Sequence, residues 1–150
     1  MWWLLAPIGL LLVAAAACSG SPGPLVADRR VHGLSPHGGQ HVASPVTISW
    51  EADFEAGEAS GLWFVLHLDT AMVPPGDSII AHAGATCADV PACIEQGQVF
   101  DHGIFLTDQT HVAVGDQYPG DHRYTVLLVN REGIRETASG WNGAFTVDAD

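Results

Sequence analysis

The residues best suited to chemistry in this chain are its eight histidines, because a neutral imidazole binds zinc or copper and also transfers protons near neutral pH. His67 and Asp69 would share one face of an extended segment, since strand side chains repeat every two residues. Together with His82, His102 and His111 they form a candidate metal-ligand set. No His-Glu-x-x-His pattern, Cys and His cluster or EF-hand loop accompanies them. The first interpretation is therefore that these histidines face the solvent, and a metal site is the second.

Recognisable catalytic motifs are absent from the sequence. The segment Gly57-Glu-Ala-Ser-Gly61 has its serine one position away from a Gly-x-Ser-x-Gly elbow, and a strand instead of a helix is expected to follow it. Glu55 and Glu58 lie in the same acidic turn, where exposure to water is expected instead of acid-base catalysis. No glycine-rich phosphate loop is present, so neither a nucleotide nor another cofactor is expected. The sequence predicts no enzyme.

The elements that would position these side chains follow an apolar N-terminal stretch. Residues 2–17 carry no charge and fall short of the roughly 20 apolar residues that span a bilayer as a helix, which fits the core of a signal peptide. Small side chains at Ala15 and Ala17 precede Cys18. This stretch resembles a bacterial lipoprotein signal, although leucine is usual where Ala15 stands and no Lys or Arg precedes the apolar core. The resemblance implies a signal peptide over 1–17 and a lipid, including palmitate, on Cys18.

Two alternatives remain for this N-terminal stretch. It is also consistent with an ordinary secretory peptide cleaved near Ala17, or with an anchor that is not cleaved. Each of the three interpretations places the rest of the chain outside the cytoplasm.

The resemblance to a lipoprotein signal also leads to a prediction about the other two cysteines. With Cys18 lipidated, Cys87 and Cys93 remain as an even pair, and Pro91 between them helps the chain to turn. An oxidising compartment favours a disulfide there. Closing so short a loop contributes about 2 kcal/mol to stability by the loop-entropy relation. We therefore predict a local structural disulfide.

The composition excludes some partners. Five arginines and no lysine stand against seventeen acidic residues, and the formal net charge is −12. Such a surface repels nucleic acid. The residues after a signal peptide suffice for one domain. Glycine, serine and proline are abundant over residues 18–43, which predicts a flexible tether, and the folded domain is expected over 44–150.

Within that domain the hydrophobic pattern has a period of two. Val46, Ile48 and Trp50 alternate with polar residues, as in a half-buried strand. Residues 62–69 are apolar on both faces, which predicts a central strand that is covered on both sides. Further extended segments are expected at 78–82, 99–100, 104–106, 111–114, 122–129, 134–137 and 143–147.

Short strands at regular intervals, without a stretch of helical period, predict an all-β fold, a single antiparallel β-sandwich. Their order resembles an immunoglobulin-like or fibronectin type III-like domain, as carried by Val46-Thr-Ile-Ser-Trp50 and by Pro119-Gly-Asp-His-Arg-Tyr-Thr-Val126. Trp50 and Trp63 are expected in the core. Tyr124 is interpreted either as a corner tyrosine that bonds to the backbone or as a plain strand residue.

These observations together predict a non-enzymatic lipoprotein of the cell envelope, a binding or structural module on a tether at the outer membrane or cell surface. Its expected partners are the membrane, through the lipid on Cys18, and an envelope or extracellular protein or glycan. Loops on a rigid sandwich often carry recognition, so Asp101-His102-Gly103 is the candidate binding loop. The alternative is a periplasmic or surface protein that binds zinc or copper through the histidine set.

Overall fold

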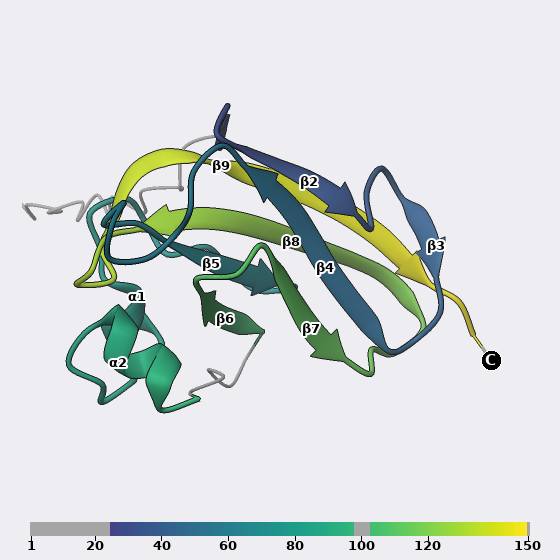
Figure 1. Ribbon diagram of the computed structural model, residues 1–150. Coiled ribbons are helices and arrows are strands. Elements are labelled where there is room, and N and C mark those ends of the chain that lie inside the picture. The colour runs from purple at the N-terminus through teal and green to yellow at the C-terminus, as the bar shows by residue number, and fades with distance from the viewer. Residues whose placement is uncertain (1–24, 98–102, 150) are drawn as a thin grey trace, which may run out of the picture.

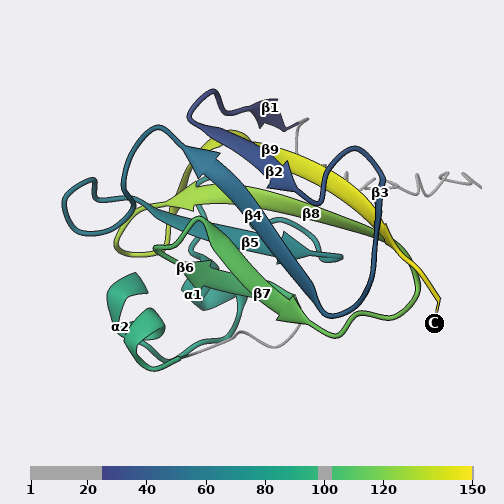
Figure 2. The same cartoon turned by 45° about the vertical axis from the view of Figure 1, so that its right-hand side comes forward.

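Two β-sheets packed face to face make up most of the protein (Figure 1 and Figure 2). The computed structural model describes residues 25–97 and 103–149. The strands and helices have these bounds: β1 Val26–Ala27, β2 Val31–Ser35, β3 Gln40–Val42, β4 Val46–Ala52, β5 Trp63–Leu68, α1 Ile79–His82, α2 Val90–Glu95, β6 Ile104–Thr107, β7 His111–Gly115, β8 Gly120–Val129 and β9 Arg135–Val147.

The larger sheet has the strand order β1-β9-β8-β5-β6, with β3 also paired to β9, and the smaller sheet has the order β2-β4-β7. The pairs β5-β8 and β8-β9 are antiparallel, whereas β1 and β3 run parallel to β9. The all-β sandwich predicted from the sequence is confirmed at this level. In the described part of the chain, no helix is both long enough and apolar enough to cross a lipid bilayer.

The main core lies between the two sheets and follows the predicted alternation. Val46, Ile48 and Trp50 of β4 are buried, while Thr47 and Glu51 between and beside them are exposed. They pack in one cluster with inward side chains of β5, β8 and β9. The period of two in the sequence therefore gives both the strand and its buried face.

Strand β5 is buried on both faces, as its sequence predicts. Phe64 and Leu66 belong to the core between the sheets. Trp63 and Val65 point to the opposite face, where they join a second apolar cluster with residues of α1, α2 and the cysteine segment. The segment between β5 and β6 thus covers part of the outer face of the larger sheet.

The folded domain begins earlier than residue 44, which corrects the predicted tether. Val31 of β2 is fully buried in the main core, β2 pairs with β4, and β3 pairs with β9. Gly38 and Gly39 adopt φ values of 56° and 76° between β2 and β3, so glycine serves a turn there instead of a flexible linker. β3 pairs with a part of β9 that lies about a hundred residues later in the sequence. Such distant pairing leaves no recognisable pattern in the sequence of a short strand.

Two short helices occur where the sequence predicts no helix. Residues 79–82, expected to be extended, form α1, and α2 lies in the cysteine segment. The Asp89 carboxylate accepts a hydrogen bond from the Ala92 amide and caps α2, and Pro91 stands in its first turn. Helices of four and six residues are too short to show a period of 3.6, which is why the hydrophobic pattern of the sequence does not predict them. The predicted extended segment at 99–100 lies outside the described residues.

The predicted disulfide is confirmed and joins Cys87 to Cys93. Both cysteines are buried in the second apolar cluster, and Cys93 lies within α2. Reducing this bond is expected to lower the free energy of unfolding by about 2 kcal/mol, because a short loop regains its entropy in the unfolded chain. Urea denaturation with and without a reductant, followed by intrinsic fluorescence, measures the change. An unchanged midpoint would contradict the expectation.

Candidate functional site

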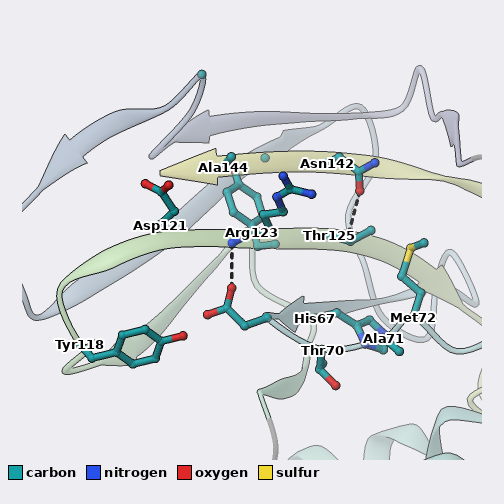
Figure 3. A pocket seen from close by; sticks show the side chains of 14 residues that line it. His67, Thr70, Ala71, Met72, Tyr118, Asp121, Arg123, Thr125, Asn142 and Ala144 are labelled. Carbon is teal, nitrogen blue, oxygen red and sulfur yellow. Dashed lines mark hydrogen bonds between the residues drawn. The ribbon is translucent and has the colours of Figure 1, made fainter. Parts of the chain in front are cut away.

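The outer face of the larger sheet, which points away from the smaller sheet, is only partly covered. At one end of the strands it is covered by α1, α2 and the cysteine segment. Over the other end, β5, β8 and β9 border a hollow of about 930 Å³ together with the segment 69–72 and Tyr118 (Figure 3). This volume lies in the range of ligand pockets.

A polar row crosses the floor of the hollow. His67 of β5 lies opposite Thr125 of β8, which lies opposite Asn142 of β9. The Thr125 hydroxyl donates a hydrogen bond of 2.7 Å to Asn142 Oδ1 (Figure 3). This bond orients the Asn142 side chain, and its amide NH2 group has no partner among the described residues.

Arg123 lies two residues before Thr125 in β8 and lines the same hollow. Its exposed guanidinium forms no ion pair or side-chain hydrogen bond within residues 25–97 and 103–149. Three other arginines have partners: Arg30 pairs with Asp28, Arg131 pairs with Glu58 and Asp89, and Arg135 donates to the carbonyls of Val73 and Thr137. Arg123 is therefore an available cation on a chain with a formal net charge of −12.

A buried histidine fixes one end of the hollow. The His122 side chain is fully buried, with Nδ1 2.6 Å from Asp69 Oδ2 and Nε2 2.8 Å from the Tyr118 carbonyl oxygen. Both partners accept hydrogen bonds, so both ring nitrogens donate and the ring is cationic. Burial lowers the pKa of His122, but the Tyr118 carbonyl and the Asp69 carboxylate outweigh it, and the net pKa is raised. The ring also stacks on Phe145, 5.1 Å away.

This arrangement positions two residues that line the hollow. Asp69 has a φ of 53°, and its second oxygen accepts a hydrogen bond of 2.8 Å from the Arg123 amide. The Tyr118 backbone is held by His122, while the residue as a whole is 65% exposed beside the hollow. Because both nitrogens of His122 are occupied, this ring offers no lone pair to a metal and no free base.

His67 and Asp69, the pair predicted to share a strand face, both line the hollow but do not bond to each other. The Asp69 carboxylate is taken up by His122 and the Arg123 amide. His67 is 1% exposed, and neither ring nitrogen has a hydrogen-bond partner within residues 25–97 and 103–149. Burial, with smaller repulsion from His82 and Arg135, lowers its pKa to about 4 and outweighs a weak opposing effect of the Ala71 backbone. His67 is thus a neutral residue of the floor.

His67→Leu is expected to change the free energy of unfolding at pH 7 by less than about 1 kcal/mol, since it removes buried nitrogens that have no partner. Between pH 6.5 and about 4, the His67 side chain binds a proton in the unfolded chain but not in the folded protein. Wild-type stability therefore falls on acidification, by at most about 1.4 kcal/mol per pH unit from this group, and leucine removes that contribution. Denaturation between pH 7 and 4 measures it. His111→Leu, at an exposed histidine, should keep the wild-type slope.

The metal-ligand set is not brought together in the described part of the chain. There, no group of three or more His, Cys, Asp or Glu side chains could hold a metal ion. His82 ends α1, and His111 begins β7 on the smaller sheet, whereas His67 lies in the larger sheet. His102 lies outside the described residues, so the set as a whole stays a prediction.

Two residues of the candidate binding loop, Asp101 and His102, also lie outside the described residues. The remaining residue, Gly103, has a φ of 75°, and its carbonyl accepts a hydrogen bond of 2.7 Å from the Leu68 amide. A Cβ at this position would overlap the Leu68 carbonyl oxygen. Gly103 therefore allows a close backbone approach. The proposed lipidation residue, Cys18, is outside the described residues as well.

The sequence interpretation missed Tyr118, Arg123 and Asn142 as site residues. One signal was available, because Asp121, Arg123 and Thr125 place polar groups at every second position of a long apolar strand. Such a row marks an uncovered face. It does not mark a hollow, because the walls come from segments far away in the sequence.

The chain was compared with known proteins, and it matches no protein-family model, no curated protein and no solved structure. The class of protein is therefore defined by the fold and the hollow alone: an all-β sandwich with one partly open sheet face.

Proposed function

We propose that this chain is a non-enzymatic lipoprotein of the cell envelope whose β-sandwich is a binding module. The observation that carries the proposal is the hollow over β5, β8 and β9. In the part of the chain that the structure describes, this sheet face carries a cation without an ion pair, an amide NH2 group without a partner and an exposed tyrosine, which together suit it to a ligand. Recognition is assigned to this face, with the predicted loop 101–103 as a second candidate.

The immunoglobulin-like type of the sandwich belongs to the same proposal. The order β2-β4-β7 corresponds to strands A, B and E of such a domain, and β9-β8-β5-β6 corresponds to G, F, C and C′. The chain also changes sheets between β2 and β3, which lets β3 run parallel to the last strand. The topology supports this assignment, as do the strand patterns of the sequence.

The envelope location rests on the resemblance of residues 1–18 to a lipoprotein signal. The Cys87–Cys93 disulfide supports it, because disulfides persist in oxidising compartments. The proposed partners are the membrane, through the lipid on Cys18, and an envelope or extracellular glycan or protein at the hollow. The formal net charge of −12 opposes nucleic acid as a partner.

The anchor is tested by the intact mass of the protein from the membrane fraction of a bacterial host. A species that begins at an acylated Cys18 supports the lipoprotein. A species that begins at Ser19 without lipid would make the chain a secreted protein, and one that retains Met1 would make it an uncleaved anchor. Recovery in the inner-membrane fraction would oppose the outer-membrane location.

The binding role is tested by oxidative footprinting of the protein in intact envelopes and after purification. Tyr118 and Met72 line the hollow and are oxidisable. If the hollow is occupied in the envelope, their oxidation should be several-fold slower there than in the purified protein. Leu34, exposed on β2 and outside the hollow, is the matched control. Equal oxidation of Tyr118 and Met72 in both samples would exclude the hollow as the binding site.

A further inference from the structure

The lining of the hollow has an excess of hydrogen-bond donors at one end. The Arg123 guanidinium and the Asn142 amide NH2 group have no protein partner among the described residues, and Figure 3 shows the Arg123 side chain extending from β8 toward β9, the strand that carries Asn142. The two carboxylates of the lining are already bonded: Asp69 to His122 and the Arg123 amide, and Asp121 to the Thr146 hydroxyl. A guanidinium binds the oxygens of a carboxylate or a phosphate through charge-assisted hydrogen bonds.

The other end of the hollow is aromatic. Figure 3 shows the Tyr118 ring across the hollow from Arg123 and Asn142. Tyr118 is 65% exposed, yet its backbone carbonyl is bonded to the buried His122, and its ring lies 4.6 Å from the His122 ring. A tyrosine ring offers an apolar face for stacking and a hydroxyl for hydrogen bonding. The ring is therefore held in place to receive a ligand that is apolar on one face and polar around its edge.

The place of the hollow in the sheet favours a small ligand over an added peptide strand. Its centre lies over β8, which is paired on both sides, with β5 and with β9. No backbone edge is open there for strand addition, which is the mode by which sheets bind extended peptides. Ligands with many negative charges, phosphate polymers included, are opposed by the net charge of the chain, which favours a ligand with few acidic groups. A ligand with a hydroxyl-rich ring and one acidic group fits both ends of the hollow. The ring suits Tyr118, and the acidic group suits the donors of Arg123 and Asn142.

We propose that the hollow binds a saccharide that carries a carboxylate. The carboxylate lies against Arg123 and the Asn142 amide, and a pyranose ring stacks on Tyr118. This inference rests on the proposed binding function and deepens it. The hollow of about 930 Å³ holds more than one sugar unit, so the acidic group and the stacked ring can belong to neighbouring units.

The test is calorimetric titration of the full-length chain, purified from a bacterial host, with oligosaccharides that contain uronic or ulosonic acids. Each is compared with its carboxyl-reduced neutral counterpart. At least one acidic oligosaccharide is expected to bind at least tenfold more tightly than its neutral counterpart. Arg123→Gln should weaken that binding at least tenfold and abolish the preference for the acid. Tyr118→Ala should weaken both forms alike, and it keeps the carbonyl that accepts from His122.

Arg29→Gln is the matched control, because Arg29 is exposed, has no partner among the described residues and does not line the hollow. It should bind within twofold of wild type. The proposal is overturned if no acidic oligosaccharide is preferred over its neutral counterpart, if Arg123→Gln and Arg29→Gln behave alike, or if the partner is a protein. In these cases protection of Tyr118 and Met72 in the envelope would still support a binding module, whereas equal oxidation would remove both proposals.

Discussion

Gly143→Ala is expected to lower the free energy of unfolding by about 3 kcal/mol, through overpacking and the loss of a buried hydrogen bond. Gly143 of β9 lies directly opposite Tyr124 of β8, and a Cβ there would overlap the tyrosine ring. The ring crosses Gly143 in order to donate a hydrogen bond of 2.7 Å from its hydroxyl to the Pro36 carbonyl. The added methyl group must displace a fully packed aromatic residue. Urea denaturation measures the change.

Two variants separate the causes of that effect. Tyr124→Phe removes only the hydroxyl and should cost about 1 kcal/mol. Ala144→Ser changes the next residue of β9, whose side chain faces the hollow, and should stay within about 0.5 kcal/mol of wild type. If Gly143→Ala were as stable as Ala144→Ser, the close packing of Tyr124 across β9 would be refuted.

Asp69→Ala is expected to destabilise the protein by about 3 kcal/mol at pH 6, because it leaves the buried His122 cation without its carboxylate. The pKa of His122 is raised in the folded protein. Its contribution to stability is thus fully present below the unfolded pKa of about 6.5, and it is lost as the pH rises through the higher folded pKa. Wild-type stability should fall over that range, and Asp69→Ala should show a weaker fall. Denaturation at several pH values measures both slopes.

A second pair of the same chemistry provides the control. His41 Nδ1 lies 2.7 Å from Asp148 Oδ1, but both side chains are more than half exposed. Exposed ion pairs contribute between about 0 and 1 kcal/mol, so Asp148→Ala should have little effect at any pH. Equal losses of unfolding free energy in Asp69→Ala and Asp148→Ala would show that burial of His122 does not strengthen its ion pair with Asp69.

The fold was predictable wherever a signal is local. The alternation of Val46, Ile48 and Trp50 gave β4 and its buried face, and the doubly apolar segment 62–69 gave the central strand β5. The strands of residues 26–42 were missed because they are short, are separated by turns and are stabilised by pairing with β4 and β9. The helices α1 and α2 were missed because neither is long enough to show a helical period.

The candidate site was less predictable than the fold. Histidine attracts attention in a sequence, yet His67 is buried with no hydrogen-bond partner in the described part of the chain, and both nitrogens of His122 are bonded. Asp69 was paired with His67 by strand periodicity. The chain leaves strand geometry at Asp69, where φ is 53°, and this turn directs its carboxylate to His122 instead.

The sequence by itself determined the all-β sandwich, its central strand and the cysteine pair, because side-chain alternation and cysteine spacing are properties of neighbouring residues. Only the tertiary structure decided which polar groups are left without partners. Arg123 is available because no carboxylate of the described residues pairs with its guanidinium. The helical segment between β5 and β6 covers one end of the sheet and leaves the other open. Burial and pairing depend on residues that are distant in the chain, so no local pattern records them.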